Sequence, residues 1–144
     1  MKTVECVALV ILKNSKLLVE KRRSDRATDP GVIVVPGGHV KEHESLEEAC
    51  SRELDEELDL KCSSFRKVGF LLWPTSVELQ RVHYFLCEDW EGVPMPREAE
   101  DIFFIGIDSL DLIDIYEERE VLEKILITRK TLQTRLRKRT GAWI

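Results

Sequence analysis

Three glutamates crowd the end of one amphipathic run in this sequence. The run LEEACSRELDEEL, residues 46–58, places apolar side chains at helical spacing. At about 100° per residue, Glu57 falls about 40° from Glu53, and Glu56 falls about 60° away on the other side. All three carboxylates therefore share the sector of the helix that should face a hydrophobic core.

An acidic sector of this kind predicts a bound cation. Carboxylates four residues apart on one helix face repel each other, and an unpaired carboxylate is costly to bury. Mg²⁺ binds carboxylate oxygens together with substrate phosphate oxygens and keeps part of its water shell. Glu53, Glu56 and Glu57 are therefore candidate metal ligands. A solvated face is the alternative, because Glu48, Arg52 and Glu56 also have the spacing of surface ion pairs.

The start of this helix and the turn before it are well marked. Ser45 has Glu48 three residues later, which is the pattern of a capping box. The turn PGGHVKEHE, residues 36–44, precedes them. Its adjacent glycines, Gly37 and Gly38, allow close approach of the main chain and leave carbonyls and amides free to bind a metal or a phosphate.

The segment GHVKEHESLEEACSRELDEELDL, residues 38–60, resembles the Nudix box, G-x5-E-x7-R-E-U-x-E-E-x-G-U, where U is aliphatic. Matches at the required spacing are Gly38, Glu44, Arg52, Glu53, Leu54, Glu56, Glu57 and Leu60. Asp59 stands where the family usually has glycine. That position is expected to end the helix with positive φ, which Asp tolerates at a cost of about 1 kcal/mol. The order of strands on either side also resembles the Nudix fold.

The resemblance implies an enzyme that hydrolyses the pyrophosphate bond of a nucleoside diphosphate linked to another group, with Mg²⁺ or Mn²⁺ as cofactor. It implies Glu53, Glu56 and Glu57 as metal ligands, with the main-chain carbonyl of Gly37 completing the set. Arg52 and Glu44 are expected to brace the loop against the helix.

A general base is also needed to take a proton from the attacking water. In the resembling family it is a glutamate of the box or an acid from a later loop. Glu53 is the first candidate. Glu98, in the loop REAED, is the second and is also a candidate metal ligand. Its neighbours Glu100 and Asp101 could take the same role.

The chain resembles MutT-type members of the family most, which implies a (d)NTP substrate, such as an oxidised nucleotide, cleaved to a nucleoside monophosphate and pyrophosphate. Arg23 and Gly38 are candidates for contact with this substrate. ADP-ribose, a sugar nucleotide or an RNA 5′ end is an alternative substrate. A non-catalytic nucleotide-binding regulatory domain is a further alternative, although intact box glutamates weigh against it. Aromatic residues that could stack on a base, or belong to the core, are Phe70, Trp73, Tyr84 and Phe104.

Alternating and apolar runs predict strands over residues 4–13, 16–22, 32–35, 61–73, 77–88 and 102–107. A hairpin is expected at Asn14-Ser15, and Pro36-Gly37-Gly38 is expected to stop the third strand. An apolar stripe predicts a C-terminal helix at about residues 117–139; its members are Val121, Leu122, Ile125, Leu132 and Leu136. We therefore expect one α/β domain over residues 1–144, a Nudix-type α/β/α sandwich with a mixed β-sheet and a C-terminal helix.

The cysteines, the histidines and the apolar runs indicate the cellular compartment and which binding patterns are missing from the sequence. The four cysteines are scattered without a CxxC pair, which favours reduced thiols and a cytoplasmic protein. The three histidines, His39, His43 and His83, have no metal-binding spacing and are expected at the surface or in the core. No apolar run approaches the roughly 20 residues of a membrane span.

The charge of the chain is uneven. The net charge is −5, and six basic residues from Thr128 onwards contribute +6, so the remainder carries −11. RNA contact by this tail is an open alternative, but acids at the start of the terminal helix and bases at its end match the helix dipole without any nucleic acid. The apolar stripe packs either on the sheet or on a second subunit, which leaves a homodimer open.

Overall fold

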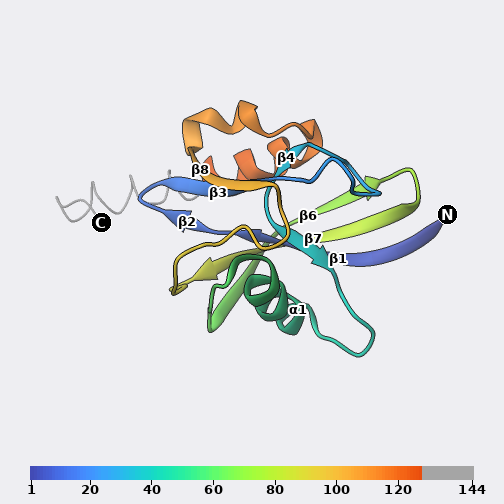
Figure 1. The fold of residues 1–144 in the computed structure, drawn as a ribbon, viewed down its shortest axis with the longest axis horizontal. Coiled ribbons are helices and arrows are strands. Elements are labelled where there is room, and N and C mark those ends of the chain that lie inside the picture. The colour runs from blue at the N-terminus through green and yellow to red at the C-terminus, as the bar shows by residue number, and fades with distance from the viewer. Residues whose placement is uncertain (128–144) are drawn as a thin grey trace.

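The first of two β-sheets is mixed. The structure is a computed structural model that describes residues 1–127 (Figure 1). The first sheet has the order β5-β1-β7-β6, from β1 (Lys2–Val10), β5 (Gly37–His39), β6 (Ser64–Pro74) and β7 (Glu78–Glu88). Strands β1 and β7 run parallel, whereas β5 and β6 pair antiparallel with their neighbours. The predicted mixed sheet is confirmed.

The second sheet is antiparallel and is centred on β3. Its strands are β2 (Leu12–Lys13), β3 (Lys16–Lys21), β4 (Ile33–Val34) and β8 (Asp101–Gly106). Strand β8 pairs along the whole of β3, so β2 and β4 share the other edge of β3. Between β2 and β3, Asn14 and Ser15 have φ of 51° and 61°, which fits a type I′ turn and confirms the predicted hairpin.

The acidic helix has two parts. Helix α1 (Leu46–Glu53) begins at Ser45 with both hydrogen bonds of the capping box. It continues into a π-helical turn, η1 (Leu54–Leu58), and ends at Asp59 in the left-handed conformation, with φ of 58°. Aspartate therefore takes the conformation expected of the family glycine. π-Helical turns inside helices often mark functional sites.

Helices cover the two faces of the first sheet, as Figure 1 shows with α1 on one side and the C-terminal helical segments on the other. Alternation along β1 explains this arrangement, because successive side chains point to opposite faces. Val7 and Leu9 pack with Leu54 and Leu58 in one core cluster. In the other cluster, Ala8 and Val10 pack with residues from the segment at 116–127. The predicted α/β/α sandwich is confirmed.

One expectation about the strands was wrong, and the predicted C-terminal helix is described only in part. Gly37 and Gly38 do not simply stop a strand: they form β5, which pairs with Val7 and Ala8 of β1. After the 3₁₀ helix η2 (Ile107–Leu112), residues 116–127 are helical. The rest of the predicted helix, residues 128–139, lies outside the described residues, as do Leu132, Leu136 and the basic cluster.

The described part of the apolar stripe packs on the sheets. Leu122 and Ile125 are buried in the core, and Val121 packs against it. None of the helices within residues 1–127 is long and apolar enough to cross a bilayer.

Candidate active site

Two of the three box glutamates are buried where α1 passes into the π-helical turn. Glu53 is 7% exposed and Glu57 is 5% exposed. Glu56 is different: 44% of its side chain is exposed, and it accepts a hydrogen bond of 3.2 Å from Nη1 of Arg52. The helix therefore turns two carboxylates into the protein and leaves the third at the rim, so the sector deduced from the sequence was too wide.

Glu57 lacks the partners that a buried carboxylate requires. Its Oε2 atom has no hydrogen-bond partner within residues 1–127. Burial raises the pKa of Glu57 well above its usual value, and the negative charges of Glu20, Glu53 and Glu98 raise it further. A divalent cation would satisfy the orphaned oxygen and offset the repulsion. The side-chain atoms near Glu57 that could coordinate a metal are carboxylate oxygens. Such ligands fit a hard cation, for example Mg²⁺ or Mn²⁺.

Glycines bring strand β5 directly against these acids. A Cβ atom on Gly38 would lie 2.4 Å from Oε1 of Glu53, and one on Gly37 would lie 2.1 Å from the carbonyl oxygen of Val7. Real Cβ atoms do not approach this closely, so only glycine fits at position 37, and a Cβ atom at position 38 would push the carboxylate of Glu53 aside. The main chain of β5 and the carboxylate of Glu53 therefore share one site, as the Gly-Gly pair suggested.

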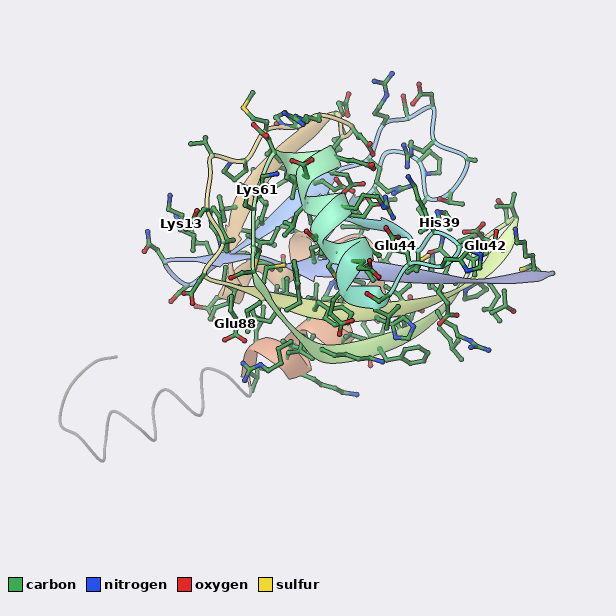
Figure 2. All side chains as sticks on the ribbon, turned by 90° about the horizontal axis from the view of Figure 1, so that it is seen from below. Lys13, His39, Glu42, Glu44, Lys61 and Glu88 are labelled. Atoms are coloured by element: carbon green, nitrogen blue, oxygen red, sulfur yellow. The ribbon has the colours of Figure 1, made fainter. Side chains whose placement is uncertain are left out.

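Arg52 braces the loop against α1, as the resemblance implied. Its Nε and Nη2 donate to the two carboxylate oxygens of Glu44 at 2.7 and 2.8 Å, and Nη2 also donates to the carbonyl oxygen of His39 at 2.9 Å. Glu44 and His39 are labelled beside α1 in Figure 2. The hydrogen bonds from Arg52 lower the pKa of Glu44 to about 2. The same guanidinium donates to Glu53 at 2.8 Å, which opposes the rise that burial causes in the pKa of Glu53.

Glu98 lies beside the buried acids. It lines a small pocket with Glu20 and Glu57, and its charge raises the pKa of Glu53 and Glu57. The two neighbouring acids point elsewhere. Glu100 forms an ion pair with Lys21 at 3.3 Å, and Asp101 accepts a hydrogen bond from the N–H of Ile102. The structure therefore singles out Glu98 among the three acids of its loop.

The sequence analysis missed Glu20. This residue lies on β3, is 5% exposed, and has its pKa raised to about 7, chiefly by burial. It pairs with Val34 on one side and Ile102 on the other, so it occupies the middle of the sheet. The available signal was an acid in the otherwise apolar run LLVE, because an unpaired acid is rare inside a central strand.

A cleft opens beside the acids and is lined by β5, β1 and β7. Arg22 and Arg26 line both this cleft and the small pocket of Glu98. Arg22 holds a loop by donating to the carbonyl oxygen of Thr28 at 2.9 Å. The guanidinium of Arg26 makes no hydrogen bond or ion pair within the described chain. Arg23, the residue expected from the sequence, lines the small pocket but not the cleft, and it pairs with Asp25 at 3.1 Å.

The floor of the cleft holds a buried polar pair. Glu118 accepts hydrogen bonds of 2.8 Å from the N–H of Val35 and from the hydroxyl of Tyr84. Burial outweighs these two bonds and raises the pKa of Glu118 to about 7. Sequence analysis did not select Glu118, although it precedes Leu122 by four residues and so falls on the apolar stripe.

Only two of the four candidate aromatic residues line the cleft. They are Trp73 and Tyr84, and Nε1 of Trp73 donates to Asp29 at 2.9 Å. Phe104 packs in the core beneath α1, and Phe70 is 45% exposed beside His83. Trp73 and Tyr84 therefore give the cleft aromatic lining beside its polar groups.

Comparisons with known proteins agree with the fold and identify the family. The family model of the NUDIX domain matches residues 2–133. The 8-oxo-dGTP diphosphatase of Buchnera aphidicola subsp. Schizaphis graminum is 30% identical over 110 residues, which are 76% of this chain and 82% of that protein. The oxidized purine nucleoside triphosphate hydrolase of Mus musculus is 29% identical over 96 residues, or 65% of this chain and 62% of that enzyme.

A solved structure shares the architecture. The MutT NUDIX hydrolase from Burkholderia pseudomallei superposes with a TM-score of 0.77 at 23% identity, covering 87% of this chain and 99% of that one. At this identity the likeness shows a shared fold.

Proposed function

This chain belongs to the NUDIX family of hydrolases, which act on pyrophosphate bonds, and we propose that its substrate is a nucleoside triphosphate. The products are a nucleoside monophosphate and pyrophosphate. An oxidised purine nucleotide is the favoured substrate, because two similar proteins are named for hydrolysis of such nucleotides. The observation that carries the proposal is the orphaned Oε2 of Glu57 among carboxylates, next to a cleft of mixed polar and aromatic lining.

The chain supplies the ligands for its cofactor. Glu53, Glu56 and Glu57 would hold Mg²⁺ or Mn²⁺ with the main-chain carbonyl of Gly37, and Glu98 would be a further ligand. When bound, such a cation would offset the negative charge of the phosphate groups and make an attacking water more acidic. Arg52 keeps Glu53 oriented through its hydrogen bond of 2.8 Å.

Proton transfer and phosphate binding fall to other side chains. Glu53 or Glu98 takes the proton of the water, since both lie in the acidic group and each carries a carboxylate that can act as general base. Arg26, which has no partner in the described chain, binds a substrate phosphate from the cleft side. Arg23 contacts phosphate only if its ion pair with Asp25 opens. Gly38 contributes main chain to the lining of the cleft.

The nucleobase of the substrate is recognised at the floor of the cleft, where Glu118 lies. The carboxyl of Glu118, whose pKa lies at about 7, both accepts and donates hydrogen bonds near neutral pH. A ring stacked on Trp73 presents its edge to such a group. An oxidised purine differs from its parent at the edge of the ring, where polar contacts discriminate most strongly.

The test is a nucleotide panel assayed with Mg²⁺ and with chelator. The panel contains 8-oxo-dGTP, dGTP, dATP, ADP-ribose, a sugar nucleotide and RNA with a 5′ cap or triphosphate, with products separated by chromatography. We expect nucleoside monophosphate and pyrophosphate from 8-oxo-dGTP at the highest kcat/KM, and no turnover with chelator. A higher kcat/KM for ADP-ribose, the sugar nucleotide or RNA would reject the proposed substrate class, and activity in chelator would reject the cofactor.

A further inference from the structure

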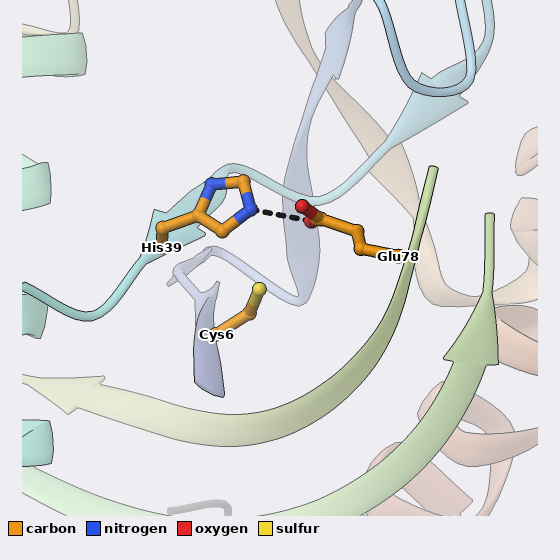
Figure 3. Close-up of side chains that lie close together, drawn as sticks. All are labelled: Cys6, His39 and Glu78. Atoms are coloured by element: carbon orange, nitrogen blue, oxygen red, sulfur yellow. Dashed lines mark hydrogen bonds and ion pairs between the residues drawn. The ribbon is translucent and has the colours of Figure 1, made fainter. Parts of the chain in front are cut away.

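Three side chains of metal-binding type converge beside the cleft, on strands that line it. They are Cys6 on β1, His39 on β5 and Glu78 on β7 (Figure 3). One potential ligand atom from each residue, Sγ, a ring nitrogen and a carboxylate oxygen, lies within 4.8 Å of the others. In Figure 3 the sulfur of Cys6 points towards the gap between the imidazole and the carboxylate.

Strand pairing explains why three residues so distant in sequence meet. Cys6 lies directly opposite His39 in the antiparallel pair of β1 and β5. Glu78 lies opposite Lys2 in the parallel pair of β1 and β7. Residues 2 and 6 of one strand face the same side of the sheet, so Glu78 shares the face of Cys6 and reaches along it.

The carboxylate and the imidazole are already oriented towards each other. Nε2 of His39 lies 2.5 Å from Oε2 of Glu78, and the side-chain amide of Gln80 donates to the same oxygen at 2.8 Å. A hydrogen bond from a neighbouring side chain, such as that of Gln80, fixes the orientation of a metal ligand and so strengthens metal binding. The thiol of Cys6 has no hydrogen-bond partner in residues 1–127 and is 5% exposed, whereas 55% of the His39 side chain is exposed. Solvent therefore reaches the cluster from the His39 side.

We propose that Cys6, His39 and Glu78 form a second metal site, which binds a cation of the Zn²⁺ type. One sulfur, one nitrogen and one oxygen suit a borderline-soft ion, whereas Mg²⁺ prefers oxygen ligands alone. On binding, the thiol of Cys6 releases its proton to solvent, and the contact between His39 and Glu78 is replaced by bonds to the ion. Three protein ligands leave the fourth tetrahedral position to water.

The alternative is a simple ion pair of His39 with Glu78 above a core cysteine. That arrangement explains the short contact but leaves the thiol without a role, and it predicts no affinity for transition metals. The metal site uses all three groups. The sequence could not indicate it, because the ligands are separated by 33 and 39 residues and belong to no local spacing pattern.

Cobalt binding tests this proposal independently of catalysis. Co²⁺ replaces Zn²⁺ at such sites and gives a thiolate-to-metal charge-transfer band, so the full chain is titrated with Co²⁺ and then with Zn²⁺ in excess Mg²⁺. We expect one Co²⁺ per chain with the charge-transfer band, and loss of the band when Zn²⁺ is added. Glu53→Gln should keep the band, which separates this site from the carboxylates of the proposed active site.

Substitutions of each ligand have matched controls. His39→Gln and Glu78→Gln should weaken Co²⁺ binding at least about 10-fold, and Cys6→Ser should abolish the band. His43→Gln and Cys62→Ser, which change the same residue types elsewhere, should bind as the wild type does. The proposal is overturned if the wild type gives no charge-transfer band, or if His39→Gln and Glu78→Gln bind Co²⁺ unchanged. These two variants decide the matter even if Cys6→Ser fails to fold.

Discussion

The main-chain N–H of Arg97 donates a hydrogen bond of 3.1 Å to the main-chain carbonyl oxygen of Glu57. The side chain of Arg97 also pairs with Asp59 at 3.0 Å and donates to the carbonyl oxygen of Asp55 at 3.2 Å. These contacts fasten the loop that carries Glu98 to the helical turn that carries the buried acid. Glu98 is exposed to solvent, and these contacts hold the loop that carries it beside the buried acids.

Glu98→Gln should lower kcat by about 10²-fold or more, because a positioned general base contributes roughly 10²–10⁴-fold. It should also remove the limb of the pH–rate profile at low pH. Steady-state kinetics from pH 5 to pH 9 measures both effects. Glu100→Gln is the matched control, since Glu100 pairs with Lys21 and should leave kcat within about 2-fold of wild type. Equal rates for the two variants would leave Glu53 as the sole candidate base.

Glu57→Gln should abolish the stabilisation that a divalent cation gives to the fold. Under the proposed function, Mg²⁺ at 100 times its Kd should stabilise the folded chain by about 2.7 kcal/mol and so raise its Tm. The variant loses a charged ligand, so its Tm should hardly respond to Mg²⁺ or to chelator, and kcat should fall by orders of magnitude.

Calorimetry with and without Mg²⁺ makes this measurement directly. Glu47→Gln, on the exposed part of α1, is the control and should keep the full Mg²⁺ response. A normal Tm increase in Glu57→Gln would show that Glu57 holds no metal.

Gly38→Ala should reduce activity far more than it reduces stability. The new methyl group would lie 2.4 Å from Oε1 of Glu53, and the end of that side chain can move aside, so the fold survives while the carboxylate is displaced. We expect kcat to fall about 10²-fold, since a displacement of about 1 Å at a catalytic centre costs that much. Gly106→Ala, whose Cβ would meet nothing closer than 3.9 Å, is the control. Comparable kcat values for both variants would separate Gly38 from the site.

Glu118 should make the fold less stable as the pH rises through the neutral range. An unfolded glutamate ionises near 4.5, whereas the pKa of Glu118 in the folded protein is about 7. Between these values the folded chain holds a proton that the unfolded chain has released, so the free energy of unfolding falls with rising pH. The free energy of unfolding falls by on the order of 3 kcal/mol in total because of Glu118, and the fall is complete above about pH 7.

Urea unfolding of Glu118→Gln between pH 4 and pH 8 isolates this contribution. The variant cannot titrate at this position, so its stability should decline less over the window than that of the wild type. Glu117→Gln, an exposed neighbour, should follow the wild type. Parallel curves for wild type and Glu118→Gln would show that Glu118 ionises in the folded state as it does in the unfolded chain.

Local patterns predicted most of the elements. Capping by Ser45, the hairpin at Asn14-Ser15 and the alternation along β1 depend on residues close together in the chain, and the structure confirms each one. Strand β5 escaped prediction because Gly37 and Gly38 resemble a strand stop. Only their pairing with β1, a contact between distant segments, makes them a strand.

Part of the candidate site could not be predicted from the sequence either. Glu53 and Glu57 emerged from helical spacing, but Glu20 and Glu118 lie on a strand and on a second helix that meet the acids only through tertiary packing. The assumed 100° per residue also fails inside the π-helical turn. Glu56 consequently lies further from the core than its place on a regular helix indicates.

The π-helical turn also limits how the length of this segment can vary in evolution. Buried acids and buried leucines alternate through it: Glu53 and Leu54, then Glu57 and Leu58. Deleting one residue between them would rotate everything that follows by one residue step, about a quarter of a turn, relative to α1. Leu58 and Leu60 would leave the core in the same event that removed Glu57 from the cleft. A viable insertion or deletion would therefore have to fall outside residues 53–60, and genes that lost a codon here would lose folding and chemistry together.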